Sequence, residues 1–295
     1  MSSTPALTIH NLTKSYGRVP ALRGVDLEVQ RGEVFGFLGP NGAGKTTTIR
    51  CLLDLIRPDG GELRVLGLDP QADALAVRRR VAYLPGELSL EPNLTAERAL
   101  RYLAELRGAA AAARPRELAE RLHLDLRTPI KNMSKGNKQK VGVIQAFMHP
   151  AELLLLDEPT SGLDPLMQQE VYELVREAQA TGATIFFSSH IIGEVEAIAG
   201  RVAVIRDGRI AQVLDPRELY ALAVRRVRVR FREPLPEGAL VGVFGATLIA
   251  REGDTATIQL EGEMDALIKA LAAYPVVDLE TERPTLEEVF LTLYN

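Results

Sequence analysis

The sequence contains no tryptophan and a single cysteine, Cys51, and aromatic residues make up only 5% of its 295 residues. One cysteine cannot form a disulfide within the chain, so a disulfide-stabilised scaffold is excluded and a reducing compartment fits the composition. We interpret Cys51 as a small buried residue of a helix. Hydrophobic residues nevertheless make up 46% of the chain, enough for a packed core in one large domain or two, which excludes a disordered protein.

Long hydrophobic runs and an excess of positive charge are also missing. The longest uncharged apolar stretch, 238–250, is interrupted by glycines and is shorter than the roughly 20 residues that span a bilayer. The start, MSSTPALTIH, has neither the basic segment nor the apolar stretch of a signal peptide. A net charge of −4 gives no general attraction for nucleic acid. We therefore expect a cytoplasmic protein that can dock onto a membrane protein and does not bind nucleic acid.

Residues 39–46, GPNGAGKT, fit the phosphate-loop pattern G-x-x-x-x-G-K-[ST]. They lie between an expected strand at 33–38 and an expected helix at 46–56, the context that such a loop requires. Backbone N–H groups of the loop can point at phosphate oxygens, Lys45 can reach the β- and γ-phosphates, and the Thr46 hydroxyl can ligate Mg²⁺. The predicted nucleotide contacts in this segment are Gly39, Pro40, Asn41, Gly42, Ala43, Gly44, Lys45, Thr46 and Thr47.

A second motif is the run LLLLDEPTSGLD at 153–164. Four leucines predict a strand buried on both faces, which delivers Asp157 and Glu158 to the carboxyl edge of the sheet, where open α/β sheets bind ligands. Asp157 is the natural second contact to Mg²⁺, and Glu158 can orient or deprotonate an attacking water. His190, after the apolar run FFSS, would reach the same edge and could hydrogen-bond the γ-phosphate. Taken alone, such a strand could simply meet a solvated loop, and such a histidine is usually structural.

The order of the expected elements indicates an α/β fold with a further domain. Strands at 7–30, 33–38, 153–156, 184–188 and 201–205 alternate with helices, including one at 165–180, which implies a mostly parallel sheet flanked by helices. A helical insert covers about 88–150. After residue 215 the pattern changes to that of a small α+β domain, 216–295, with strands near 227–231, 256–260 and 276–279, a helix at 265–272 and a closing helix from 285. Alternating arginines at 226, 228 and 230 are most simply one solvated strand face, with a partner surface as the alternative.

These motifs, in this order and spacing, resemble the ATP-binding subunits of ABC transporters over residues 7–214. The resemblance implies a P-loop NTPase core with an antiparallel β subdomain and a helical subdomain, in an ABC-type ATP-binding domain at 1–215. It also implies that Tyr16 stacks on adenine, that residues 161–164 form the D-loop, and that His190 is the switch histidine. Without the resemblance, Tyr16 would be read as a half-buried side chain.

The family's signature motif L-S-G-G-Q is replaced here by residues 133–137, MSKGN. Ser134 and Gly136 are retained, and on the resemblance they bind the γ-phosphate of a nucleotide held by a second ATPase subunit, so a homodimer around two Mg-ATP is expected. Lys135 and Asn137 depart from the pattern. A further departure is Gly86, where the family usually has a glutamine that helps to ligate Mg²⁺, so that either Glu87 or water would take its place.

The tail at 285–291, TLEEVFL, and the S-K-G signature are similar to exporter-type subunits whose membrane domains are separate chains. The resemblance thus implies an ATPase on the inner face of the cell membrane, bound to a transmembrane permease. One alternative is an ABC-type ATPase that acts on nucleic acid or the ribosome without a transporter, although neither a long coiled coil nor a second core is present. Another is a small-molecule kinase, which would leave the signature segment, the D-loop and His190 without a purpose.

Overall fold

The computed structural model describes residues 4–107, 113–218, 225–236, 238–240 and 242–282. The chain divides into two compact units, Met1–Val213 and Leu214–Asn295. The division falls within strand β9 (Arg209–Leu214), two residues before the boundary expected after residue 215. Each unit is described below by itself.

The first unit is built on a six-stranded sheet with the order β5-β6-β7-β3-β8-β9. Its strands are β3 (Val34–Leu38), β5 (Val81–Leu84), β6 (Leu153–Asp157), β7 (Thr184–Ser189), β8 (Arg201–Arg206) and β9. The β5–β6, β6–β7, β7–β3 and β3–β8 pairs are parallel. Every residue of β3, β6 and β7 is buried, as expected of strands covered on both faces. The predicted mostly parallel α/β sheet is confirmed.

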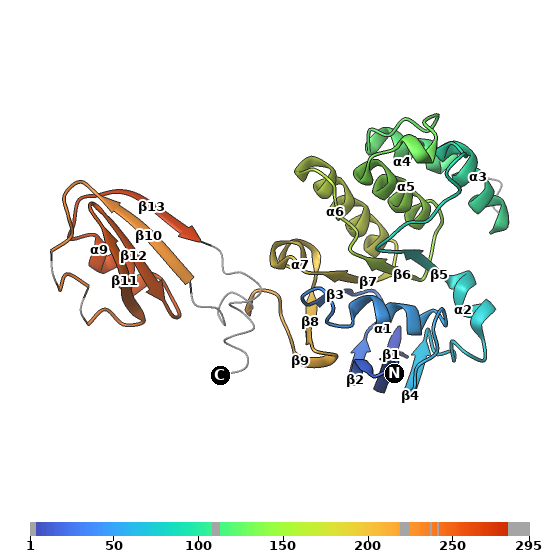
Figure 1. Ribbon diagram of the computed structural model, residues 1–295, viewed down its shortest axis with the longest axis horizontal. Helices are drawn as coiled ribbons and strands as arrows, with labels where there is room; N and C mark the ends of the chain where they lie inside the picture. Colours follow the sequence, from blue (N-terminus) through green and yellow to red (C-terminus); the bar gives the residue numbers. More distant parts are fainter. Residues whose placement is uncertain (1–3, 108–112, 219–224, 237, 241, 283–295) are drawn as a thin grey trace. The chain divides into compact units, whose positions relative to one another are not determined.

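A separate antiparallel sheet, β2-β1-β4, packs on one side of this sheet, with helix α1 between them (Figure 1). Its strands are β1 (Leu7–Tyr16), β2 (Val19–Val29) and β4 (Gly60–Val65), and α1 spans Lys45–Leu52. Buried side chains from both sheets and from α1 form one continuous apolar core, so the phosphate loop at the start of α1 is anchored from two sides. The predicted antiparallel β subdomain is therefore present.

The expected helix at 46–56 is shorter than predicted. It ends at Leu52, with Leu53 as its C-cap, because Asp54 adopts a left-handed φ of 50° that no α-helix can continue. The amides of Leu55 and Ile56 both donate to the Arg50 carbonyl in the turn that follows. The periodic apolar residues beyond Leu52 thus belong to this turn.

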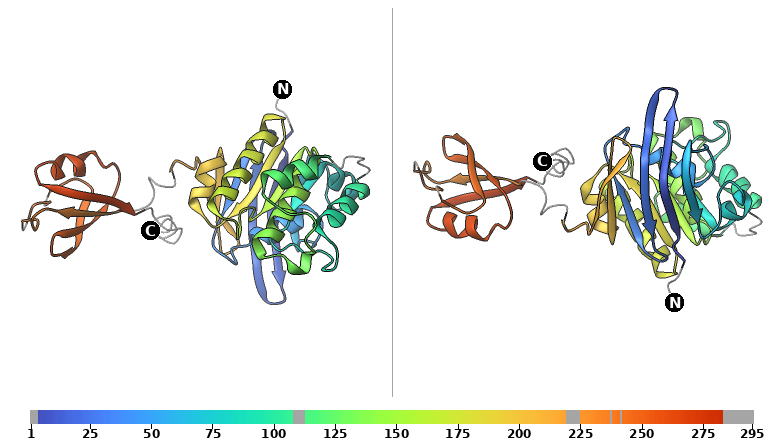
Figure 2. Two further views of the ribbon diagram at one scale, coloured as in Figure 1. Left: turned by 90° about the horizontal axis from the view of Figure 1, so that it is seen from above. Right: turned by 90° about the horizontal axis from the view of Figure 1, so that it is seen from below.

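Helices cover the opposite side of the central sheet, as the two views in Figure 2 show from either face. The helical insert contains α3 (Ala96–Leu106), α4 (Ala113–Arg121), a 3₁₀ turn at Ile130–Asn132 and α5 (Lys135–Phe147). The remaining helices of the unit are α2 (Ala74–Arg80), α6 (Pro165–Ala180) and α7 (Ile192–Ile198). Helix α6 has the predicted bounds, because the Asp164 carboxylate caps it by accepting from the Met167 amide and Pro165 occupies its first position. Within the described ranges, no helix is long and apolar enough to cross a bilayer.

The second unit contains a four-stranded antiparallel sheet, β11-β12-β10-β13, and helix α9 (Asp265–Leu271). The strands are β10 (Arg225–Phe231), β11 (Ala246–Glu252), β12 (Thr255–Leu260) and β13 (Val276–Glu282). Buried residues of β10 and β12 pack with Leu267 and Leu271 of α9 in a separate core. Arg226, Arg228 and Arg230 are exposed and lie opposite the acidic residues of β13 in register. The closing helix expected from residue 285 lies outside the described residues.

Candidate functional site

The phosphate loop connects β3 to α1 and holds Lys45 among its own backbone carbonyls. Lys45 Nζ donates to the carbonyl oxygens of Gly39 at 2.7 Å and Pro40 at 3.2 Å, and the side chain is buried. Gly44 has a φ of 108°, and a Cβ there would lie 2.8 Å from the Ala21 carbonyl, so only glycine fits. The Gly39 amide donates to the Ser189 carbonyl at the end of β7, which fixes the start of the loop to the neighbouring strand.

Asp157 ends strand β6 and Glu158 follows it, as the leucine run predicts, but their environments differ. Asp157 is fully buried, and its Oδ1 accepts from the Ser188 hydroxyl at 2.5 Å, whereas its Oδ2 has no hydrogen-bond partner. Gly86 borders this free oxygen, because a Cβ built on Gly86 would lie 3.2 Å from Asp157 Oδ2. A buried carboxylate oxygen without a partner is costly unless another group binds there, as a cation would.

The backbone of Glu158 is held in a left-handed conformation, with φ 53°. For a non-glycine residue this costs roughly 1–3 kcal/mol and persists only where the surroundings impose it. Here the Glu158 amide donates to the Ser188 carbonyl at 3.2 Å and to the Ser188 hydroxyl at 3.0 Å, and its carbonyl accepts from Gln139 Nε2 at 3.0 Å. These contacts hold the backbone of Glu158 on both sides of its Cα.

The Glu158 carboxylate lies between the two predicted partners of the phosphate. Its Oε1 is 3.2 Å from Lys45 Nζ, and its Oε2 is 2.6 Å from His190 Nδ1. His190 is partly exposed, while Lys45 is buried. Three residues that lie far apart in the sequence therefore meet, and they form a cation–carboxylate–imidazole cluster at the carboxyl edge of the sheet.

This cluster lines a cavity of about 630 Å³. The predicted site residues along its wall are Asn41, Gly42, Gly44, Lys45, Thr46, Thr47, Glu158 and His190. Ala21, Gly86, Glu87, Lys135 and Ser161 line it as well. Four other predicted site residues are not among the residues that line the described cavity: Gly39, Pro40, Ala43 and Asp157. The carbonyls of Gly39 and Pro40 bind Lys45, which lines the cavity, and Asp157 lies beside Gly86, which also lines it. The loop thus provides a contiguous wall suited to a polyphosphate.

Tyr16 is not brought into this cavity. It ends β1 next to the β1–β2 turn and pairs in register with Val19, and its side chain is 49% exposed. The Lys14 ammonium lies 6.0 Å from the ring centroid. Further along β2, Ala21 lines the cavity, so the hairpin that carries Tyr16 also contributes to the nucleotide wall.

The segment that corresponds to the signature motif begins helix α5. Ser134 is its exposed N-cap and accepts from the Asn137 amide at 3.2 Å. A Cβ on Gly136 would lie 2.6 Å from the Gly162 carbonyl, so this glycine allows close contact with the D-loop. Of the three central residues, only Lys135 lines the cavity described above. Among the described residues, Ser134 and Gly136 do not line this cavity of their own chain.

Ser188 and Gln139 are supporting residues that the sequence analysis missed. Ser188 contacts both acidic residues, and Gln139 Nε2 also donates to the Pro159 carbonyl at 2.9 Å. The run FFSSH already contained a signal for Ser188, because a serine that ends a buried strand beside Asp157 needs a polar partner. The sequence held no comparable signal for Gln139 beyond its position three residues after Gly136.

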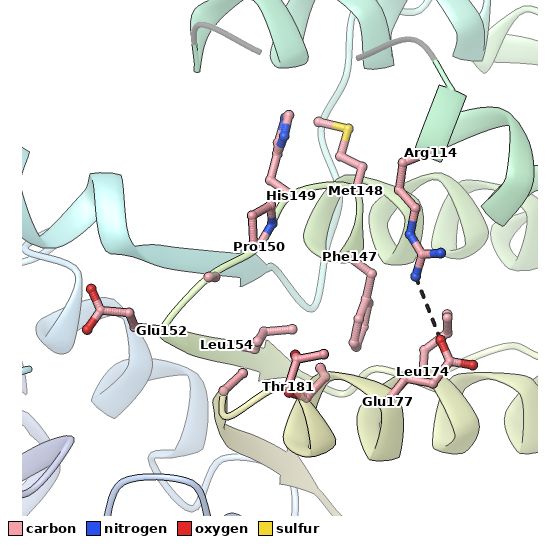
Figure 3. A pocket seen from close by; sticks show the side chains of 13 residues that line it. Arg114, Phe147, Met148, His149, Pro150, Glu152, Leu154, Leu174, Glu177 and Thr181 are labelled. Atoms are coloured by element: carbon pink, nitrogen blue, oxygen red, sulfur yellow. Dashed lines mark hydrogen bonds and ion pairs between the residues drawn. The ribbon is translucent and has the colours of Figure 1, made fainter. Parts of the chain in front are cut away.

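A second cavity, of about 740 Å³, lies at the other end of β6 (Figure 3). Apolar residues such as Phe147, Leu154 and Leu174 line it. Its charged residues are already engaged, because Arg114 pairs with Glu177 at 3.7 Å and Glu152 pairs with Arg80 at 2.5 Å. The predicted catalytic residues Lys45, Glu158 and His190 converge instead on the first cavity, which makes that cavity the candidate site.

Comparisons with known proteins identify the family of the chain. An ABC transporter family model matches residues 22–161. The daunorubicin resistance ATP-binding protein DrrA3 of Streptomyces coeruleorubidus is 36% identical over 98% of this chain and 95% of its own length. The Nod factor export ATP-binding protein I of Ralstonia nicotianae is 34% identical over 74% of this chain and 70% of its own length. A solved ATP-binding subunit of an ABC transporter is 32% identical with a TM-score of 0.66, and the match covers 73% of this chain and 92% of that one.

The fold and the site define a P-loop ATPase. The chain belongs to the family of ABC transporter ATP-binding subunits, and it binds and hydrolyses ATP as the nucleotide-binding subunit of such a transporter.

Proposed function

We propose that two copies of this chain close around two Mg-ATP and drive the export of a substrate through a separate membrane permease. The observation that carries the proposal is the cluster of Lys45, Glu158 and His190 on the wall of the cavity beside the phosphate loop. One cation for the phosphate and one carboxylate for water are what ATP hydrolysis requires.

The residues present fit a magnesium ion. Asp157 Oδ2 is buried without a hydrogen-bond partner, and Thr46 lines the adjoining cavity. Mg²⁺ is usually held by one or two protein oxygens together with substrate phosphates and water. We therefore assign Thr46 and Asp157 as the magnesium-holding residues, and the bound ion would neutralise charge on the phosphates. Gly86 leaves the space beside Asp157 open for a water ligand.

Each catalytic side chain then has a separate role. Lys45 neutralises the β- and γ-phosphates, and the backbone amides of residues 39–47 hold their oxygens. Glu158 orients the attacking water and accepts its proton. His190, 2.6 Å from Glu158, fixes this carboxylate and contacts the γ-phosphate. Glu158 Oε1 lies 3.2 Å from Lys45 Nζ, so the carboxylate that handles the water is next to the cation that binds the phosphate.

A second subunit would supply the missing side of the site. The exposure of Ser134 and the position of Gly136 outside its own cavity support this assignment. The Ser134 hydroxyl and the N-terminus of the 13-residue helix α5 present donors and a positive dipole end, which suit a γ-phosphate of the partner's nucleotide. Tyr16, on the exposed hairpin, would stack on adenine.

Export through a permease is supported by the names of relatives, which include resistance and export proteins. The ATPase would act at the inner face of the membrane through that permease. Residues 1–215 would form the ATP-binding domain, and residues 216–295 an accessory α+β domain.

The proposal is tested with Glu158→Gln, which keeps the shape of the side chain but cannot accept the proton of water. With Mg-ATP, this variant should accumulate as a dimer in size-exclusion chromatography with light scattering, and it should co-purify with a membrane chain when isolated from membranes. A variant that stays monomeric with saturating ATP would overturn the dimer, and a chain that never associates with a membrane protein would overturn the transport role.

A further inference from the structure

A carboxylate next to the cluster has no role in the chemistry described so far. Glu194 lies in the first turn of α7 and is only 4% exposed. Its Oε2 accepts from the Ser189 hydroxyl at 2.6 Å, and its Oε1 accepts from the Thr160 hydroxyl. Each oxygen of one buried carboxylate thus binds a different segment of the chain.

The two hydroxyl groups come from the segments that carry the catalytic side chains. Thr160 follows Glu158 by two residues, and Ser189 directly precedes His190. Ser189 makes two further hydrogen bonds: its hydroxyl accepts from the Ile191 amide at 2.9 Å, and its carbonyl accepts from the Gly39 amide at 3.1 Å. Through these contacts Glu194 connects the end of β6, the turn after β7 and the start of the phosphate loop.

Burial of this carboxylate is costly. Burial raises the pKa of Glu194, and hydrogen bonds from Ser189 and Thr160 oppose this shift. An apolar side chain of similar size would fill the space beside α7 without this cost, because buried charge is expensive unless it is fully hydrogen-bonded. The two hydroxyl contacts therefore indicate a role beyond filling space.

We propose that Glu194 is a positioning residue for ATP hydrolysis, which joins the segment after Glu158 to the segment before His190. By fixing both segments, it keeps the Glu158 carboxylate and the His190 ring at hydrogen-bond distance on the cavity wall. The inference rests on the roles proposed above for these two residues.

The test compares steady-state ATP hydrolysis by the full chain and its Glu194→Ala variant. Misplacement of catalytic groups should lower kcat about tenfold to a hundredfold, while KM for ATP stays within about twofold, because Glu194 does not hydrogen-bond to Lys45 or its carbonyl partners, Gly39 and Pro40. Glu194→Gln keeps one acceptor oxygen and should restore part of the loss. The matched control is Glu196→Ala, an exposed carboxylate on the same helix, which should leave kcat unchanged.

A double-mutant cycle with His190→Ala separates positioning from a general structural role. If Glu194 acts through His190, Glu194→Ala should lower kcat much less in the His190→Ala background than in the wild type. The same cycle with Glu158→Gln tests the other segment, and an equal fold loss in the wild-type, His190→Ala and Glu158→Gln backgrounds would overturn the proposal. If Glu194→Ala does not fold, Thr160→Val carries the same cycle, because it removes one hydroxyl and keeps the side-chain volume.

The result also distinguishes this inference from the proposed function. If Glu158→Gln and His190→Ala both hydrolyse ATP at the wild-type rate, the assigned catalytic roles are wrong. If those two variants lose activity while Glu194→Ala and Thr160→Val keep wild-type kcat, only the positioning role of Glu194 is overturned.

Discussion

The two segments proposed to contact ATP differ in how many contacts hold them within the chain. At the carboxyl end of β6, the backbone and side chain of Glu158 are contacted by Ser188, Gln139, Lys45 and His190. At the start of α5, the exposed hydroxyl of Ser134 only caps its own helix. A site shared between two subunits requires one segment that is already held in place, as around Glu158, and another that is exposed to the partner, as at Ser134. Changes at Glu158 should therefore abolish ATP hydrolysis, and changes at Ser134 should weaken dimerisation.

The largest effect is expected from Glu158→Gln. Loss of the group that accepts the water proton should lower kcat by about 10²- to 10⁴-fold while ATP still binds, as measured by hydrolysis and by binding of a fluorescent ATP analogue. The control is Glu152→Gln, which changes an exposed carboxylate at the other end of the same strand. Wild-type turnover by Glu158→Gln would show that another group handles the water.

A negative charge at Ser134 should weaken dimerisation as well as hydrolysis, unlike the change at Glu158. Ser134→Asp keeps an acceptor for the helix cap but sets a negative charge against the γ-phosphate, so ATP-dependent dimerisation and hydrolysis should fall about a hundredfold. Ser134→Asn keeps the cap without the charge and should lose much less. The dimer dissociation constant of both variants, measured by analytical ultracentrifugation with ATP in the Glu158→Gln background, checks this. Equal loss in the two variants would attribute the effect to the hydroxyl rather than to charge.

Gly86 tests the metal side of the catalytic end. In Gly86→Ala, the new Cβ would press on Asp157 Oδ2 at 3.2 Å while Ser188 holds the other oxygen, so Asp157 has little room to move. The Mg²⁺ concentration for half-maximal activity should rise up to about tenfold. Titration of Mg²⁺ against hydrolysis and against displacement of bound Mn²⁺ measures it, and chelation with EDTA should abolish hydrolysis in every variant. An unchanged titration would exclude Asp157 as a metal ligand.

The smallest effect is expected at Glu152, which belongs to neither the Glu158 cluster nor the Ser134 segment. Arg80 and Arg31 lower the pKa of Glu152 to about 2, so their contribution to stability is present above the unfolded pKa of about 4.5 and is lost as pH falls toward 2. Glu152 is largely exposed, so Glu152→Gln should lower the melting temperature by only a degree or two near neutral pH. The difference from wild type should shrink below about pH 4.5 in thermal scans. A difference that grows on acidification would contradict the ion-pair account.

The sequence predicted the central strands and their catalytic ends because apolar runs that end in polar residues have few alternative structures. The bounds of α6 could also be predicted, since Asp164, Pro165 and Gly182 are local start and stop signals. By contrast, the helix predicted to extend to Ile56 ends at Leu52, because the left-handed conformation of Asp54 has no marker in the periodic pattern. Strand β11 was missed because most of its residues read only as part of an uncharged stretch.

The support of the catalytic site was harder to predict than its reacting groups. Lys45, Asp157 and Glu158 stand in motifs whose chemistry follows from residue type and spacing. Glu194 and Glu196 stand on the same short helix, and only the folded chain separates the buried carboxylate from the exposed one. Contacts made between segments far apart in sequence, such as Gln139 to Glu158, depend on packing that a local pattern does not contain.

The shared site is tested most directly by mixing two inactive variants. Lys45→Ala damages the phosphate loop, and Ser134→Asp damages the opposing helix end, so each homodimer has two defective sites. In a mixed dimer, one site would carry both changes and the other would carry none. An equimolar mixture should therefore regain hydrolysis that neither component shows. Random pairing would give about a quarter of the wild-type rate, because half of the dimers would be mixed and each of these has one intact site. A mixture that stays as inactive as its components would contradict the account.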